Sequence, residues 1–434
     1  MNRKIRNFDE LAVTEERKHV LDLLEYGLQS VDTGMAVKRN VSFDGRILTI
    51  VGEHYSIADI GKVFVVGVGK CALEAVQALE DVLGDKIYGG VMVDVHDGKL
   101  RTGKIQTFVG DHPFPTERNI SATKAIIDLL KDAEEKDLVL VAVSGGGSSL
   151  LCQPENLTCY EERKIDEALF RAGAPIQKVN TVRKHLSLAK GGYLAKYAFP
   201  ARVVSIIFSD VPGDDVQFIA SGPTAFDSTT VQDALNVLHE YNVFSECPFV
   251  AQGLLETPKE LKYFERVRNT IIVSNKIALQ VMKEVAERKG AQAKIQAFDF
   301  SGHARHIGAG IVDALKINPP NTFLLYGGES TVVLKASGGK GGRNMEVALS
   351  ALRFASEHDV IVSLASDGRD NTEFAGGICD IITKQKAIRF GLDPRDFLNR
   401  NDSYSFFSKT GDYIDTGDTG SNISDLIVGV RFKK

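Results

Sequence analysis

Leu138-Val-Leu-Val-Ala-Val-Ser-Gly-Gly-Gly-Ser-Ser149 is the segment that says most about the architecture of this chain. Its first half is apolar without alternation, which is typical of a central strand buried on both faces of a parallel sheet. Three consecutive glycines follow, between Ser144 and Ser148. Glycines let the backbone approach phosphate oxygens closely, and a helix that begins after such a turn directs N–H groups and the positive end of its dipole at them. The segment therefore predicts a buried strand that ends in an anion-binding turn.

Similar turns of small residues follow other apolar runs, at 63–70, 324–329 and 363–368, and a further glycine-rich stretch lies at 337–344. The charged residues that these turns supply are Lys70, Glu329, Lys340, Arg343 and Asp367. Together the turns predict a cleft for a polyanion.

Strands and helices alternate from residue 62 onward, which predicts a parallel sheet with helices on both faces. In the first half we expect strands at 63–66, 90–95, 138–143 and 203–208, and helices at 72–83, 121–132 and 228–241. In the second half we expect strands at 270–273, 293–298, 322–326, 331–335, 360–365 and 425–432, and helices at 276–288, 304–315 and 344–356. A helix over 14–34 and a strand over 47–51 precede them. Parallel sheets bind ligands at the carboxyl ends of their strands, where the glycine turns lie.

A length of 434 residues exceeds one ordinary core and indicates two α/β domains. The polar, proline-bearing stretch that begins at Glu246 puts the boundary near residue 245. We expect 1–50 to be an N-terminal helical segment that could join the second domain. Residues 51–245 would form the parallel-sheet domain and residues 246–434 a smaller α/β domain, with the active site in the cleft between the two.

The composition is that of a soluble globular protein, with 43% hydrophobic and 25% charged residues. A net charge of -5 argues against a nucleic-acid partner, because phosphate backbones are held by an excess of Lys and Arg. The N-terminus lacks the apolar core of a signal peptide and no later stretch could span a bilayer, so we expect a cytoplasmic protein without a membrane partner. The five cysteines include no C-x-x-C pair, which argues against a disulfide framework or a structural zinc site.

The first glycine turn is open to two interpretations. Gly67-Val-Gly-Lys-Cys-Ala72 fits the Gly-x-Gly-x-x-Ala form of a dinucleotide fingerprint, and Asp94 at the end of the next apolar run could be its ribose carboxylate. Lys70 within the turn is better suited to neutralising a carboxylate or a phosphate than to lying beneath a pyrophosphate. We therefore favour a functional Lys70 and keep an NAD(P)H-dependent hydroxypyruvate reductase, which needs no metal, as a rival function.

Further charged groups lie near the predicted turns. Arg183 and Lys190 are seven residues apart, and on one helix they would share a face. Asp210 follows the strand at 203–208, where a carboxylate can hold Mg²⁺, accept a hydroxyl proton, or do both. No Walker A sequence and no protein-kinase motif set occurs. His112 lies in a turn with two prolines, and its role is open.

The order of these motifs resembles the glycerate 2-kinase family, whose members have an N-terminal Rossmann-like domain and a C-terminal MOFRL domain. The matching segments span most of the chain and are Gly67-Val-Gly-Lys70, Gly110-Asp-His-Pro-Phe-Pro115, Ser144-Gly-Gly-Gly-Ser148, Asn180-Thr-Val-Arg-Lys184, Ser209-Asp210, Gly213-Asp-Asp215, Ser221-Gly-Pro-Thr224, Gly327-Gly-Glu329 and Gly341-Gly-Arg-Asn344. The loops at 367–373 and 416–420 depart from the family's pattern. The resemblance implies a Rossmann-like first domain and ATP-dependent, Mg²⁺-assisted phosphorylation of D-glycerate to 2-phosphoglycerate.

The resemblance assigns the active centre to the lysine of the first turn and the arginine of the Gly-Gly-Arg-Asn motif, which are Lys70 and Arg343 here. Phosphoryl transfer asks a protein mainly for positioning and charge neutralisation, which these cations would supply while binding substrate. Arg183 could pair with the glycerate carboxylate. Asp210 is the expected proton acceptor or Mg²⁺ ligand, and Asp367 is a second candidate metal ligand. The expected ATP-binding residues are Ser144, Gly145, Gly146, Gly147, Ser148, Lys190 and Glu329.

A non-catalytic sensor of a sugar acid or a nucleotide is the second rival function. The residues alone leave open which hydroxyl of glycerate is phosphorylated, because both products need the same charges. They also leave open the oligomeric state and the nucleotide and metal preference.

Overall fold

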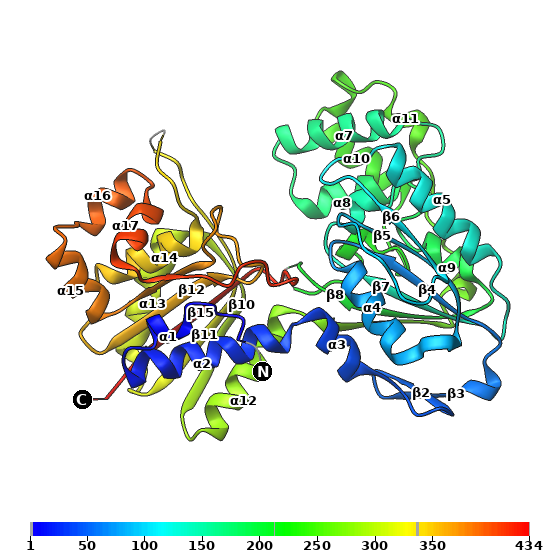
Figure 1. Ribbon diagram of the computed structural model, residues 1–434. Helices are drawn as coiled ribbons and strands as arrows, with labels where there is room; N and C mark the ends of the chain where they lie inside the picture. The colour runs from blue at the N-terminus through cyan, green and yellow to red at the C-terminus, as the bar shows by residue number, and fades with distance from the viewer. Residues whose placement is uncertain (1–2, 212, 336–337, 434) are drawn as a thin grey trace. The chain divides into compact units, whose positions relative to one another are not determined.

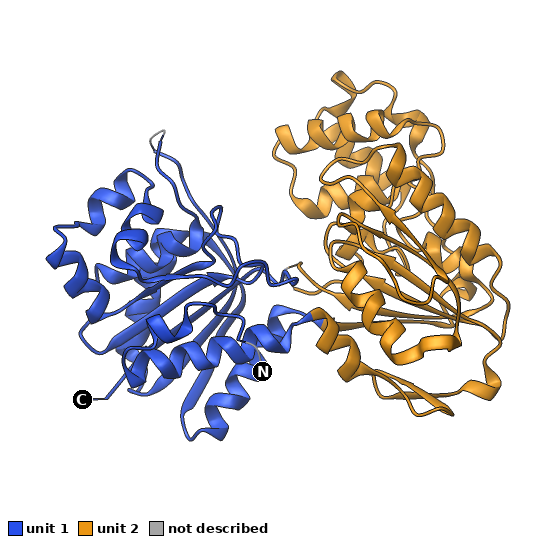
Figure 2. Ribbon diagram, in the orientation of Figure 1, with its two compact units in different colours: residues 1–32, 273–434 blue, residues 33–272 orange. Residues whose placement is uncertain are grey.

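The computed structural model (Figure 1) describes residues 3–211, 213–335 and 338–433, so Ser337 of the expected turn at 337–344 lies outside the described residues. The chain forms two compact units, which Figure 2 distinguishes by colour. One consists of Thr33–Ile272, and the other combines Met1–Asp32 with Val273–Lys434. In the part of the chain that is described, no helix is long and apolar enough to cross a membrane.

The unit Thr33–Ile272 is built on a six-stranded sheet with the order β6-β5-β4-β7-β8-β9. The first strand of the sheet, β4, lies at its centre. β5 and β6 follow on one side of β4, and the chain then crosses to β7 on the other side. The pairs β4–β5, β5–β6, β4–β7 and β7–β8 are all parallel. This is the order of a doubly wound, Rossmann-like sheet, whose switch point lies between β4 and β7. The strands are β4 (Val63–Val68), β5 (Ile87–Asp94), β6 (Ile105–Val109), β7 (Leu138–Val143), β8 (Arg202–Phe208) and β9 (Val267–Val273).

Helices cover both faces of this sheet, which confirms the expected fold class. α5 (Glu117–Lys131) and α9 (Tyr193–Ala198) pack on the face that includes Val66. Gly67 points to the opposite face, where α4 (Ala72–Leu83) lies so close that a Cβ on this glycine would meet a methyl group of Val76 at 2.6 Å. β4 and β7 are buried along their whole length, which explains why their sequences are apolar without alternation.

Two smaller parts complete this unit. A helical cluster has its own hydrophobic core, formed by residues such as Leu169, Val182 and Leu238. Its helices are α7 (Cys159–Arg171), α8 (Ile176–Lys184), α10 (Val231–Glu240) and α11 (Val250–Gly253), which lie together in Figure 1. An antiparallel sheet comprises β1 (Val41–Phe43), β2 (Ile47–Ile50) and β3 (Glu53–Ser56), and it follows α3 (Thr33–Asn40).

The other unit contains a mixed sheet with the order β10-β11-β15-β12-β13-β14. β10 and β11 are parallel, and the remaining neighbours are antiparallel. Leu426 of β15 lies near Gly27 of α2, whereas Ile427 belongs to the core formed with α13 and α14, so helices cover both faces here too. The elements are α1 (Phe8–Leu11), α2 (Glu15–Ser30), α12 (Asn275–Arg288), β10 (Gln292–His303), α13 (Ala304–Ile317), β11 (Thr322–Thr331), α14 (Arg343–Leu352), β12 (Asp359–Ala365), β13 (Gly376–Cys379), α15 (Ile381–Arg389), α16 (Pro394–Asn399), α17 (Ser403–Thr410), β14 (Tyr413–Ile414) and β15 (Asp425–Arg431).

Two features differ from the expectation. The strand expected to open the second half, β9, forms an edge of the parallel sheet instead, because Val267 and Ile271 pack against the core of that sheet. The units therefore divide at residue 272, whereas the sequence indicated a boundary near 245.

The predicted strand at 331–335 is wrong: β11 ends at Thr331, and Leu334 is exposed. Among residues 3–211, 213–335 and 338–433, no strand extends β11 beyond that point.

The N-terminal helix α2 belongs to the unit of the C-terminal half. Arg17 near its start is buried and donates from Nε and Nη2 to both oxygens of Asp380, and from Nη1 to Asp412. Both carboxylates are buried as well. A buried charge is tolerated only when it is paired and hydrogen-bonded. This cluster therefore fixes α2 to the segments that carry the two aspartates.

Replacing Arg17 should destabilise this unit, because the buried carboxylate of Asp380 would lose its cation and that of Asp412 would keep only Lys386. We expect Arg17→Ala to lower the free energy of unfolding by about 3–5 kcal/mol, measured by urea denaturation with circular dichroism. Lys18→Ala removes an exposed ammonium near Glu15 and should change the same quantity by less than about 1 kcal/mol. Equal effects of the two substitutions would contradict the anchoring role of Arg17.

Candidate active site

Two glycine turns meet at the switch point of the parallel sheet. Gly69 follows β4 with a φ of 123°, and Gly146 follows β7 with a φ of 81°, both in the region that favours glycine. A Cβ on Gly69 would collide with the hydroxyl of Ser144, so the two turns are in contact. The backbone N–H of Lys70 donates to the carbonyl of Gly145 at 3.0 Å. The Gly-x-Gly-Lys turn and the triple glycine are therefore parts of one structure.

Lys70, His112 and Asp210 converge on the second of these turns. A Cβ on Gly146 would lie 3.0 Å from Cε of Lys70 and 3.2 Å from Cδ2 of His112. A Cβ on Gly145 would overlap the carboxylate of Asp210. The three side chains come from loops that follow β4, β6 and β8 at the carboxyl edge of the sheet. A cation, an imidazole and a carboxylate thus surround a turn that has no side chains of its own.

A cavity of about 580 Å³ opens beside this turn, within the size range of small-molecule sites. Its polar end is formed by Gly145, Gly146, His112, Asp210 and Arg183. The rest of the wall combines Phe114, Phe170, Ile176 and Phe218 with the polar side chains of Glu167, Arg171 and Gln177. The cavity can therefore hold a ligand with an anionic part and a second part that presents both apolar and polar atoms.

His112 is kept neutral in this setting. Burial, together with the neighbouring cations Lys70 and Arg183, lowers the pKa of His112 to about 4. A neutral imidazole has one N–H donor and one acceptor nitrogen. The polar end of the cavity thus offers an uncharged hydrogen-bonding group beside two cations.

Arg183 is held by a carboxylate and an aromatic ring. Its Nε donates to Asp166 at 3.0 Å, and its Nη2 lies 2.9 Å from the same carboxylate. The guanidinium carbon lies 5.4 Å from the centre of the Phe170 ring. These contacts fix the guanidinium at the cavity wall. Because the side chain is already ordered, binding of an anion there costs little further side-chain entropy.

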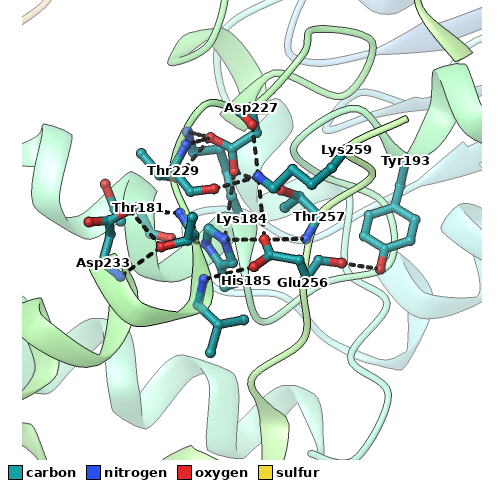
Figure 3. Close-up of polar contacts among 12 residues, drawn as sticks. Thr181, Lys184, His185, Tyr193, Asp227, Thr229, Asp233, Glu256, Thr257 and Lys259 are labelled. Atoms are coloured by element: carbon teal, nitrogen blue, oxygen red, sulfur yellow. Dashed lines mark hydrogen bonds and ion pairs between the residues drawn. The ribbon is translucent and has the colours of Figure 1, made fainter. Parts of the chain in front are cut away.

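The residues that follow Arg183 turn away from the cavity and into a buried polar cluster (Figure 3). Lys184 donates to Asp227 at 2.6 Å, and both side chains are buried. Nδ1 of His185 donates to the carbonyl of Thr181 at 2.8 Å. A buried ion pair of this kind is costly to break from one side. The cluster therefore anchors α8, the helix that presents Arg183 to the cavity.

The two serines that flank the glycines differ in role. Ser144 is buried, and its hydroxyl accepts a hydrogen bond from the backbone N–H of Cys71 at 3.3 Å, so it holds the two turns together. Ser148 lines the cavity, 2.9 Å from the hydroxyl of Ser221. Gly147 opens the short helix α6 (Gly147–Leu150). Of the predicted cradle, Gly145, Gly146 and Ser148 thus face the cavity, whereas the Ser144 hydroxyl serves the fold.

Lys190 is not brought to the cavity. α8 ends at Lys184, so Arg183 and Lys190 do not share a helix face. Nζ of Lys190 donates to Glu162 at 2.6 Å, and both side chains are buried. Because a buried pair needs both of its partners, this ammonium cannot turn outward to a phosphate without leaving an uncompensated carboxylate.

A second charged cluster lies in the other unit, around Arg343. Arg343 donates from Nε and Nη2 to the two oxygens of Asp425 at 2.7 and 2.9 Å, and its Nη1 lies 2.9 Å from Glu329. Asp370 is buried and accepts from the backbone N–H of Asn344 at 3.0 Å. Burial raises the pKa of Asp370 to about 7. Two predicted site residues, Arg343 and Glu329, are therefore in direct contact.

Asp367 lies in the loop of this unit that departs from the family's pattern. Its carboxylate accepts from the backbone N–H of Arg369 at 2.9 Å. Gly368 approaches the carbonyl of Gly417 so closely that a Cβ would collide with it, so the two departing loops pack on each other. They line a second cavity of about 460 Å³, whose charged lining residues are Arg6, Arg369, Glu373, Asp415 and Asp418.

Asp94, the candidate ribose carboxylate, has a structural role. It is buried, and it accepts from the backbone N–H of Leu73 in the first turn of α4 at 2.9 Å. Its other oxygen accepts from the backbone N–H of His96 at 3.0 Å. Because the side chain is fully buried, a ribose hydroxyl could not reach it without a change in the surrounding structure.

The apolar half of the cavity is the part that sequence reasoning missed. Phe170 and Ile176 come from α7 and α8, and the expectation contained no helix over α7. The signal was present as a capping box, in which Thr158 and Glu161 exchange side-chain and backbone hydrogen bonds at the start of α7. The role of His112 was open because the strand that precedes it, β6, was not predicted either.

The chain is similar to known proteins over most of its length. A family model described as "Domain of unknown function (DUF4147)" matches residues 19–256, and one described as the MOFRL family matches residues 322–425. The chain is 35% identical to a glycerate 2-kinase of Pyrococcus horikoshii over 95% of this chain and 98% of that protein. It is 37% identical to a putative hydroxypyruvate reductase of Agrobacterium vitis, over 84% of this chain and 86% of that protein. The crystal structure of a glycerate kinase from Thermotoga maritima matches with a TM-score of 0.84 and 35% identity, covering 95% of this chain and 99% of that one.

Removing the positive charge of Lys70 should raise the pKa of His112. In the unmodified protein the ring signals of His112 should titrate with a midpoint of about 4, and in Lys70→Met the midpoint should move toward the ordinary 6.5. NMR of histidine-labelled protein measures both values. Lys62→Met removes a lysine that lies over the Tyr88 ring and should leave the midpoint unchanged. An unshifted midpoint in Lys70→Met would argue against the contact between these two side chains.

Proposed function

Because the chain belongs to the glycerate 2-kinase family, we propose that it transfers the γ-phosphoryl group of ATP to D-glycerate and forms 2-phosphoglycerate. The similarity extends over nearly the whole chain, so it includes both units. The observation that carries the proposal is the convergence of Lys70, His112 and Asp210 on the turn at Gly145 and Gly146.

The charges at this turn suit phosphoryl transfer. Negative charge is spread over the oxygens of the transferred group in the transition state, so a protein contributes mainly by positioning and neutralisation. Lys70 meets the transferred group, and the backbone of Gly145 and Gly146 binds phosphate oxygens, because glycine leaves room for a close approach. Arg183 pairs with the glycerate carboxylate, for which a guanidinium is well shaped.

The reaction needs one acceptor for a proton. The hydroxyl oxygen of glycerate forms a bond to phosphorus, while the bond between phosphorus and the leaving oxygen of ADP breaks. The hydroxyl proton passes to the carboxylate of Asp210, which lies against Gly145 beside the phosphate-binding turn. His112, as a neutral group, can donate one hydrogen bond to a phosphate oxygen.

Magnesium fits this arrangement. Over residues 3–211, 213–335 and 338–433 there is no group of three or more His, Cys, Asp or Glu side chains that could hold a metal ion. Mg²⁺ is, however, usually bound by one or two carboxylates together with the phosphates of its substrate. Asp210, which lies against the glycine turn, is the carboxylate that would hold it, and Asp367 is a second candidate in the other unit. When bound, the ion would neutralise charge on the triphosphate.

Arg343 is the second cation of the proposal. Its bidentate bond to Asp425 fixes the plane of the guanidinium, and its contact with Glu329 fixes the third nitrogen. A preorganised arginine stabilises developing negative charge without reorganising during the reaction. Lys190 and the hydroxyl of Ser144 have no part in the proposal, because both are engaged inside the protein.

An NAD(P)H-dependent reductase is the rival activity, and it is less well supported. The acidic residue that would bind ribose in a dinucleotide site, Asp94, is buried and accepts hydrogen bonds from two backbone N–H groups. A sensor without activity would not need a carboxylate against the phosphate-binding turn. Both rivals are separated from the kinase by the assay below.

The purified protein should release ADP when it is given ATP, Mg²⁺ and D-glycerate, and NMR of the product should identify 2-phosphoglycerate. Lys70→Ala and Arg343→Ala should each lower kcat/KM by about 100-fold or more, since each removes a charge that stabilises the transition state. Circular dichroism and thermal melting of the variants check that they are folded. Arg343→Lys serves as a second variant, because it keeps the charge and loses the bidentate geometry.

Lys62→Ala and Arg353→Ala are the matched controls and should keep nearly full activity, because their side chains lie over aromatic rings away from both clusters. Activity retained in Lys70→Ala or Arg343→Ala would remove that residue from the active centre. Oxidation of NADH with hydroxypyruvate, without ADP release, would overturn the kinase proposal in favour of the reductase.

A further inference from the structure

The cavity beside the glycine turn is larger than its anionic end requires. Its volume is about 580 Å³, and glycerate is a three-carbon acid that the polar groups around Gly146 and Arg183 could hold alone. The remaining lining includes Phe114, Phe170 and Ile176 together with the polar side chains of Glu167, Arg171 and Gln177. Sites of this volume ordinarily bury ligands of drug size. The shape therefore calls for a ligand with a second, apolar part.

Two apolar residues of the cavity lining are exposed. Phe170 is 48% and Ile176 is 45% exposed, although both line a concave site. They are neighbours across the junction of α7 and α8, so they form one patch. Contiguous exposed apolar surface in a cavity marks a ligand-binding wall. A flat apolar group placed there would cover side chains that water now contacts.

The chemistry of the wall favours an aromatic heterocycle over an aliphatic chain. The guanidinium of Arg163 lies 4.0 Å from the centre of the Phe114 ring, and that of Arg183 lies 5.4 Å from the centre of the Phe170 ring. Polar side chains, Glu167 and Gln177, also reach the lining. Purine bases stack on aromatic and guanidinium planes and carry hydrogen-bonding edges, which a hydrocarbon chain lacks.

We propose that the wall formed by Phe170 and Ile176 binds the base of the nucleotide whose phosphates lie on the turn at Gly145 and Gly146. The inference rests on the proposed function, which supplies a nucleoside triphosphate as the phosphoryl donor. It goes further by assigning the donor's base to the helical cluster of the unit Thr33–Ile272. The helical cluster then selects a nucleotide over other polyphosphates.

Steady-state kinetics of Phe170→Ala and Ile176→Ala test this assignment. Loss of the wall should raise KM for ATP about 10-fold in both variants. Ile176→Ala should leave KM for glycerate unchanged, whereas Phe170→Ala also removes a contact of Arg183 and should raise KM for glycerate as well. Inorganic tripolyphosphate, which has no base, should inhibit the variants and the unmodified enzyme equally well. Phe354→Ala is the matched control: Phe354 is also 48% exposed, and it also lies near an arginine, at 5.0 Å from Arg353, but it belongs to the other unit. It should leave both KM values unchanged.

A rise in KM for glycerate with no change for ATP would overturn the assignment, and so would unchanged values for both. Equilibrium binding separates this inference from the activity itself. If the unmodified protein did not phosphorylate glycerate, the proposed function would fail. Tighter binding of ADP than of tripolyphosphate, lost in Phe170→Ala, would still support the base site. Equal binding of ADP to both proteins would overturn it.

Discussion

The close approach of two backbone turns at the centre of the parallel sheet is the constraint on which the candidate active site depends. The register of β4 and β7 pairs Val68 with Val143, so both strands end at the same level. Gly69 then has no room for a side chain, because the hydroxyl of Ser144 occupies that space and also accepts from the backbone beyond it. Only a turn without side chains leaves space for groups from three other loops to reach one point.

Charged residues of similar appearance in the sequence divide into two kinds in the structure. Arg183 lines the cavity, whereas its neighbour Lys184 is buried against Asp227, which lies 43 positions further along the chain. Lys190 is likewise buried against Glu162, 28 positions before it. Arg183 and Lys184 are consecutive residues of one helix, yet the first faces the cavity and the second faces the interior. The buried carboxylates that pair with Lys184 and Lys190 are distant in sequence. No local pattern contains that information.

What could be predicted follows the same division between local and distant causes. The strand at 138–143 and the helix at 72–83 have the expected bounds, because buried strands and amphipathic helices are specified by their own residues. The position of β9 could not be inferred, since its sequence suits either sheet and only the free edge beside β8 decides. The sequence predicted that the glycine turns lie at the carboxyl ends of the strands. The contact of Lys70 with the triple glycine appears only in the structure. The apolar wall did not, because α7 and α8 form it only after folding into a separate cluster.

The path of the chain through its two units has a consequence for its biogenesis. β15, the last strand, occupies an inner position of the mixed sheet between β11 and β12, while α2 at the other end of the chain packs in the same unit. The unit Thr33–Ile272 is an uninterrupted segment inserted between these two parts. As domains fold while the chain leaves the ribosome, the inserted unit has all its strands early. α2 is made before the inserted unit, and its apolar stripe stays uncovered until α12 and then β15 of its own unit have been made.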